Sequence, residues 1–216
     1  MRHILIAVLD PAQRGADNKV FSYLRQLEQW MLAPDTQLLV QRLPCVFKHS
    51  LLVMEQLINQ YQPSQLLLVA QQATLVQISM EKVALNINHA IEYDSEGQQP
   101  NDSLIAQHGP AAYFSNLPLT AIVRQLHSAS IPAQLSYHAG TFVANHAFYG
   151  LMHYIKHQNT SLQGGLLQLP LLPEQACSLS GVASINSEQM LQAIKLTLQS
   201  CLAHSDSMLR PASAFG

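Results

Sequence analysis

The chain has 216 residues, of which 48% are hydrophobic and only 11% are charged, against roughly a quarter charged in typical soluble domains. That length and hydrophobic content suit one well-packed α/β domain with a sizeable core. The formal net charge of −2 excludes the strongly basic surface that is typical of nucleic-acid-binding proteins.

The start of the chain and its cysteines indicate the cellular compartment in which the protein is expected to work. The apolar stretch in the N-terminal run MRHILIAVLDP is too short for a signal peptide or a membrane span, so we expect a first buried strand there. Cys45, Cys177 and Cys201 are odd in number and widely spaced, and they predict neither a disulfide framework nor a zinc motif. We therefore expect a cytoplasmic protein with no cofactor and with no nucleic-acid or membrane partner.

Apolar runs and helical periodicity alternate through the first part of the chain. Continuous apolar runs predict buried strands over residues 4–9 and 66–70, and a further strand is expected over 38–43. Apolar residues at helical spacing predict a helix from Val20 to Met31, capped by Asp17, and a second helix over 51–61, capped by Ser50.

The second part of the chain begins with an irregular excursion. Residues 88–115 are rich in Asn, Asp, Gly, Pro and Ser, and long ordered segments of this kind are often functional. The expected elements after it are a helix over 119–128, a strand over 133–137, a helix over 142–157, a strand over 165–169 and a helix over 187–204. This alternation predicts a single domain over 1–204, built as a three-layer α/β/α sandwich, with a flexible tail over 205–216.

The turn Gly140-Thr141 before the third of these helices is a first candidate site. Unpaired backbone N–H groups and the helix dipole would lower the pKa of a thiol in the first helical turn and could hold an oxyanion. Ala144 stands at that position and has no reactive atom. Considered alone, a Gly-Thr turn before a helix is ordinary structure.

Glu81 and Cys45 are further candidates. Glu81 could orient a histidine or bind an amine, but from its spacing alone we favour a surface salt bridge with Lys82. Cys45 could replace a lost nucleophile. It has no base at a fixed spacing and follows an apolar strand, so we expect it to behave as a small hydrophobic residue.

Three histidines follow one stripe of the helix over 142–157. His153 and His157 are four residues apart, and His146 lies two turns earlier. A zinc site needs a third or fourth ligand and supporting hydrogen bonds, and no carboxylate accompanies the stripe. We expect a half-solvated helix face and no bound metal.

Taken as an ordered set, six segments resemble the pyroglutamyl peptidase I (pyrrolidone-carboxylate peptidase) family of cysteine peptidases. They are PCVFKHS (44–50), ISMEKVALN (78–86), EGQQP (96–100), GPAAYFSNLP (109–118), IPAQLSYHAGTFVANHAFYGLMH (131–153) and LPLLPEQ (169–175). The resemblance implies a twisted, mixed central sheet, assembly into homodimers or homotetramers, and removal of an N-terminal pyroglutamyl residue from peptides. In such enzymes a cysteine attacks the pyroglutamyl carbonyl, a histidine is its base, and a glutamate belongs to the same site.

Carried over residue by residue, the resemblance fails at the reactive groups. The glutamate is retained as Glu81, but Ala144 stands at the nucleophile position and Gln168 at the base position. Ile91 replaces an arginine near the oxyanion. In the implied substrate pocket, Gln71 is retained, whereas Leu9 and Ala12 replace aromatic residues.

A single engineered cysteine-to-alanine change would explain Ala144 but not the other replacements. Alanine has no nucleophilic atom, and glutamine is no base near neutral pH. We therefore interpret the chain as a naturally diverged homologue that binds a small molecule or a peptide N-terminus, or that assembles, without cleaving peptides. Two alternatives stay open: altered chemistry on another small substrate that uses Glu81, and a true peptidase inactivated at Ala144 by engineering.

Overall fold

Strands and helices alternate along the chain, and the computed structural model describes residues 1–13, 15–158 and 161–209, with side chains through residue 205. The strands are β1 (Arg2–Leu9), β2 (Thr36–Leu43), β3 (Gln65–Gln71), β4 (Ile78–Glu81), β5 (Val83–Leu85), β6 (Ala112–Phe114), β7 (Ala133–Ser136) and β8 (Gln163–Leu169). The helices are α1 (Lys19–Leu24), the 3₁₀ helix η1 (Arg25–Gln29), α2 (His49–Tyr61), α3 (Leu119–Ser128), α4 (Val143–His157), α5 (Pro173–Ala176) and α6 (Ser187–Leu209).

The central sheet has six strands in the order β2-β1-β3-β8-β4-β7. Its neighbouring strands are parallel, except that β4 and β8 run antiparallel. The expected mixed sheet is therefore confirmed. A separate antiparallel pair, β5 and β6, lies beside it.

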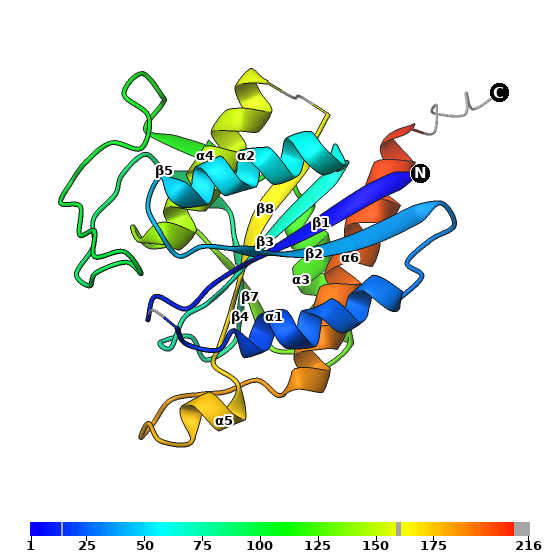
Figure 1. The fold of residues 1–216 in the computed structure, drawn as a ribbon. Coiled ribbons are helices and arrows are strands. Elements are labelled where there is room, and N and C mark those ends of the chain that lie inside the picture. The colour runs from blue at the N-terminus through cyan, green and yellow to red at the C-terminus, as the bar shows by residue number, and fades with distance from the viewer. Residues whose placement is uncertain (14, 159–160, 210–216) are drawn as a thin grey trace.

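Helices cover both faces of the sheet (Figure 1). Because successive side chains of a strand point to opposite faces, Ile4, Ile6 and Val8 of β1 pack with α1, α3 and α6. Leu5 and Ala7 pack on the other face with α2 and α4. The three-layer α/β/α sandwich is confirmed, and α4 is the helix that covers β8 on the second face.

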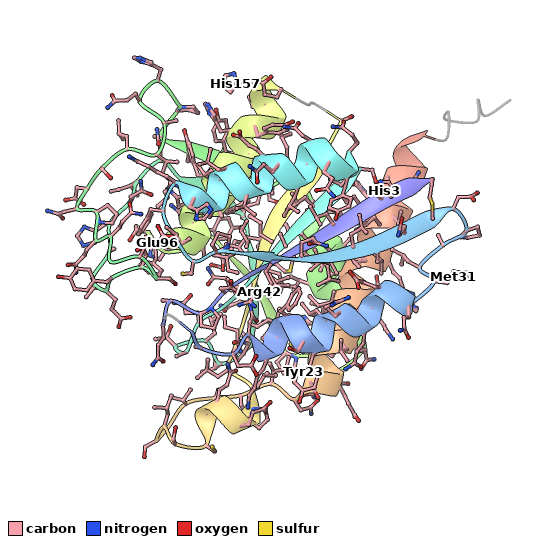
Figure 2. All side chains as sticks on the ribbon, in the orientation of Figure 1. His3, Tyr23, Met31, Arg42, Glu96 and His157 are labelled. Carbon is pink, nitrogen blue, oxygen red and sulfur yellow. The ribbon has the colours of Figure 1, made fainter. Side chains whose placement is uncertain are left out.

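The helix expected over 20–31 is shorter than predicted. It ends at Leu24 and tightens into η1, and Met31, expected to face the core, is 80% exposed at the edge of the molecule (Figure 2). Asn18 caps α1 in place of Asp17, because its side-chain oxygen accepts a hydrogen bond from Phe21 N at 2.9 Å.

The start of α2 also differs from the prediction. Lys48 precedes the helix with φ 63°, and no side chain caps it. A residue in this conformation turns the chain sharply into the helix, so Ser50 falls inside the first turn and is buried rather than capping.

Two further departures concern short strands and the C-terminal helix. Strand β4 was not among the expected elements, although Ser79 and Glu81 alternate with Ile78 and Met80 as in a half-exposed strand. All four side chains are buried. Strand β6 lies inside the excursion expected to be irregular.

Helix α6 continues to Leu209, beyond the expected end of the domain at 204. Residues 210–216 of the expected tail lie outside the described residues. No helix in the described part of the chain is long and apolar enough to cross a membrane.

Candidate functional site

A cavity of about 300 Å³ lies at the carboxyl ends of β1, β3 and β8. Ligands of open α/β sheets bind in the crevice outside the carboxyl ends of the strands. The cavity is lined by Leu9, Asp10, Pro11, Ala12, Cys45, Ala70, Gln71, Ala73, Phe142, Ala144, Leu171 and Gln175. Five residues singled out from the sequence therefore meet here, namely Leu9, Ala12, Cys45, Gln71 and Ala144.

The first turn of α4 forms one wall of the cavity. Gly140, with φ 78°, turns the chain toward the helix, and Phe142 occupies the N-cap position without a side-chain hydrogen bond. The first backbone N–H groups of a helix have no intrahelical acceptor, and they mark the positive end of its dipole. Ala144 presents a methyl group beside these donors.

Gln71 is less available than expected. Its amide forms a cyclic pair with Gln175: Gln71 Nε2 donates to Gln175 Oε1 at 2.8 Å, and Gln175 Nε2 donates to Gln71 Oε1 at 3.0 Å. Gln175 gives no signal in the sequence, because its position depends on α5, a helix of only four residues. The amide pair forms a neutral polar wall.

A second hollow of about 450 Å³ adjoins the cavity and shares Asp10, Pro11 and Cys45 with it. Arg42 also lines this hollow, and its Nε donates to Asp10 Oδ1 at 2.8 Å. A ligand that extends out of the apolar cavity would therefore meet a charged, solvent-exposed region.

Glu81 and Gln168 lie near each other on neighbouring strands, but neither lines the cavity. Gln168 is opposite Ser79 in the register of β8 and β4, and Glu81 is the next residue along the same face of β4. Both are buried, and one oxygen of each, Glu81 Oε2 and Gln168 Oε1, has no hydrogen-bond partner. Gln168 Nε2 donates to Ala139 O at 3.2 Å.

The surface salt bridge proposed for Glu81 is wrong, because the residue is only 1% exposed and accepts a hydrogen bond from Ser79 Oγ at 2.6 Å. Burial raises the pKa of Glu81, while the hydroxyls of Ser136 and Ser79 and the charge of His138 act in the opposite direction. The alternation of ISME could have revealed the strand, but not that both of its faces are buried.

Ile91 lies away from the cavity. Its side chain is 87% exposed and is not among the cavity-lining residues. The implied role of this position beside the substrate therefore has no support in the geometry.

Comparisons with known proteins agree with one another. A family model described as pyroglutamyl peptidase matches residues 2–204. A pyrrolidone-carboxylate peptidase of Enterobacter sp. (strain 638) is 37% identical over 208 residues, covering 96% of each chain. One from Cupriavidus pinatubonensis is 38% identical over 204 residues, covering 94% of each chain. The crystal structure of pyroglutamyl peptidase I from Bacillus amyloliquefaciens superposes with a TM-score of 0.89 at 33% identity, covering 94% of this chain and 96% of that one.

The chain belongs to the pyroglutamyl peptidase family. The resemblance to other pyroglutamyl peptidases assigns the nucleophile to the position of Ala144, which lies on the cavity wall. It assigns the base to the position of Gln168, which is buried behind that wall on β8. Neither side chain can perform the corresponding step.

Cys45 is the one thiol among the described residues that line the cavity at the start of α4. Burial, together with the negative charges of Asp94 and Asp10, raises its pKa to about 12. A thiol is nucleophilic only as the thiolate, so this environment opposes a reactive role. The buried position agrees with the small hydrophobic residue expected from the sequence.

The three histidines of α4 lie in two different environments. His146 is buried, contrary to the expected half-solvated face: Lys48 N donates to its Nε2 at 3.0 Å, and its Nδ1 faces Asn88 Oδ1 at 2.7 Å. Burial and the charge of Lys48 lower the pKa of His146 to about 4. His153 and His157 lie toward the other end of the helix, and within the described residues no three His, Cys, Asp or Glu side chains form a metal-binding group.

Proposed function

We propose that this member of the pyroglutamyl peptidase family does not hydrolyse pyroglutamyl peptides and instead acts as a binding protein through the cavity at the start of α4. The observation that carries the proposal is the methyl group of Ala144 in the first turn of that helix. No histidine lines the cavity within the described chain, and its one thiol, Cys45, has a pKa raised to about 12. Without nucleophile and base, only binding and the backbone donors remain.

The shape and lining of the cavity favour a small, uncharged ligand or the N-terminus of a peptide. Apolar groups, among them Leu9, Phe142 and Leu171, make up most of the lining, and the amide pair of Gln71 and Gln175 provides neutral polar contacts. The adjoining hollow beside Arg42 leaves room for the rest of a longer ligand.

Altered chemistry that uses Glu81 is less well supported. A carboxyl group with a raised pKa is typical of general acids, but Glu81 is buried and lies outside the cavity lining. An engineered loss of the nucleophile would not explain Gln168, Leu9 and Ala12 together.

We further infer a cytoplasmic homodimer or homotetramer. The low share of charged residues, 11%, leaves little repulsion between copies. The three cysteines are free, which suits a reducing compartment.

The test is release of a chromophore from a pyroglutamyl amide by the purified chain. We expect no release above the buffer background, before or after alkylation of the cysteines. Release that disappears only in Cys45→Ser would identify that thiol as a replacement nucleophile and would overturn the proposal. Release that survives alkylation would also overturn it, because another group would then perform the reaction.

A further inference from the structure

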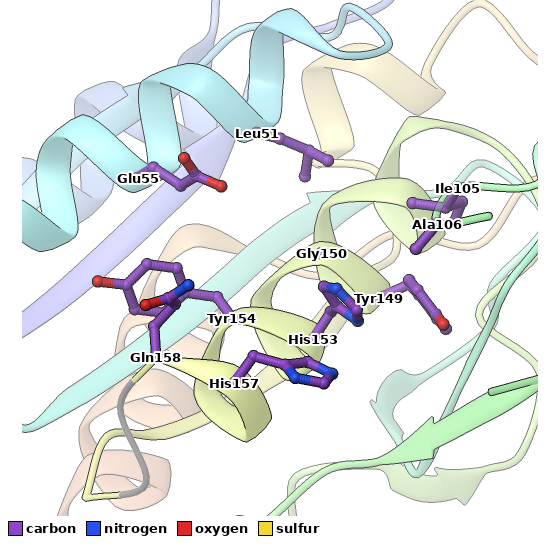
Figure 3. Close-up of a pocket in the computed structure, with 10 residues that line it drawn as sticks. All are labelled: Leu51, Glu55, Ile105, Ala106, Tyr149, Gly150, His153, Tyr154, His157 and Gln158. Atoms are coloured by element: carbon purple, nitrogen blue, oxygen red, sulfur yellow. The ribbon is translucent and has the colours of Figure 1, made fainter. Parts of the chain in front are cut away.

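A groove of about 150 Å³ separates α2 from α4, far along α4 from Ala144. The two helices approach closely at Gly150, where a Cβ atom would lie 2.3 Å from Leu51 Cδ2. Beyond this contact the groove is lined by Glu55 from α2 and by His153 and His157 from α4. Figure 3 shows the two imidazole rings one turn apart on α4, with Glu55 on the helix across the groove.

Three possible metal ligands converge beside this groove. The hydroxyl oxygen of Tyr113, on β6, is 3.0 Å from His153 Nδ1 and 3.4 Å from His157 Nε2. The centroids of the two imidazole rings are 4.4 Å apart. The phenol carries one proton and can donate it to only one of these nitrogens.

These separations also suit a metal ion. In a tetrahedral site with metal–ligand bonds of about 2.0–2.1 Å, neighbouring ligand atoms lie about 3.3 Å apart. The two distances from Tyr113, 3.0 and 3.4 Å, fall on either side of that value. The hydrogen-bonded side chains of Tyr113, His153 and His157 would therefore need to move little in order to coordinate one metal ion.

We propose that His153, His157 and Tyr113 form a binding site for a divalent transition-metal ion that prefers imidazole ligands, with Cu²⁺ held more tightly than Zn²⁺. Glu55 lines the same groove from α2, but within the described residues it forms no metal-binding group with the two histidines. This site is independent of the cavity at Ala144.

The third ligand of this site is not the histidine that the sequence suggested. The sequence offered His146 as the third member of the stripe, but that imidazole is buried and hydrogen-bonded at both nitrogens. The third ligand is Tyr113, forty residues before His153, and it lies in a segment expected to be irregular. Only the pairing of β6 with β5 brings it to α4.

The test is calorimetric titration of the full chain with CuCl₂ and with ZnCl₂, in a Cys177→Ser background that removes the one exposed thiol. We expect one equivalent of Cu²⁺ bound, at least about tenfold more weakly in His153→Ala and in His157→Ala. Tyr113→Phe should keep some affinity but lose the visible phenolate-to-copper absorption band. His108→Ala, at an exposed histidine outside the cluster, is the matched control.

Thermal unfolding without metal shows whether each variant folds, and the metal-induced rise in Tm is a second readout. Equal binding by the original chain and by both histidine variants would overturn the proposal, as would no binding by the original chain up to millimolar metal. A Tyr113→Phe variant that keeps the absorption band would remove the tyrosine from the site and leave a two-histidine pair, which contradicts the three-ligand assignment.

Discussion

The methyl group of Ala144 and the amide of Gln168 decide which steps the site can perform. A thiol at position 144 would lie in the first turn of α4, where backbone N–H groups and the helix dipole lower its pKa. Gln168 donates to Ala139 O and has no nitrogen that titrates near neutral pH. Under the proposed function, the backbone part of a hydrolytic site is present without the two side chains that transfer the proton and attack the substrate.

Free pyroglutamate and pyroglutamyl dipeptides should bind no tighter than about millimolar. The resemblance to pyroglutamyl peptidases places aromatic rings at Leu9 and Ala12, and loss of each ring removes about 1.5–3 kcal/mol of burial. Phe142 is an aromatic side chain that remains in the lining. Isothermal calorimetry measures the affinity directly.

A matched variant, Leu9→Phe, should tighten the binding of pyroglutamate because it restores one ring to the cavity wall. Micromolar binding by the unmodified chain would contradict the argument from lost aromatic burial. It would indicate a protein that still recognises a pyroglutamyl group without cutting it.

The contact between His146 of α4 and the start of α2 should make the free energy of unfolding depend on pH. His146, on α4, accepts from Lys48 N at the start of α2 and faces Asn88 in the excursion. Its pKa falls from 6.5 to about 4 in the folded chain, so unfolding takes up a proton between these values. The free energy of unfolding should therefore decrease by about 3 kcal/mol as the pH falls from 6.5 to 4.

Urea unfolding of the His146→Gln variant checks this prediction. The variant should be less stable at pH 7, by about 1–3 kcal/mol, and should lose less stability than the original chain between pH 6.5 and 4. His108→Gln, at an exposed position, should follow the original chain. Parallel pH profiles for the original chain and His146→Gln would show that the buried imidazole is not responsible.

The long elements could be predicted because their apolar patterns are unambiguous. The continuous runs of β1 and β3 and the periodic helices α2, α3 and α4 lie where the sequence placed them, within a few residues. The burial of Glu81 on β4 could not be predicted, because a buried glutamate has the same sequence pattern as an exposed one. The difference depends on α4, which covers that face of the sheet.

Considered as a whole, the molecule should form a homo-oligomer. Charged residues are few, and large apolar side chains such as Tyr93, Phe114 and Tyr137 are more than half exposed, which favours contact between copies. Multi-angle light scattering across micromolar concentrations should give a multiple of the 23.9 kDa chain mass. A mass of one chain at all concentrations would refute this prediction.

The sequence also indicated where the cavity would be, but not how its side chains pair. Leu9, Ala12, Gln71 and Ala144 come together from three distant segments; that this cavity holds the substrate, as the resemblance implies, stays a prediction. The engagement of Gln71 by Gln175 and the outward position of Ile91 could not be foreseen. Both depend on local turns and short helices that leave little periodic signal in the sequence.

The most direct measurement is kcat/KM for a pyroglutamyl amide in the original chain, in Ala144→Cys, in Gln168→His and in the double variant. The account predicts background rates for the original chain and both single variants. It also predicts a gain in the double variant that exceeds the product of the single effects, because nucleophile and base act as a unit. Efficient hydrolysis by Ala144→Cys alone would contradict the account, since one missing thiol would then be the whole difference from an active peptidase.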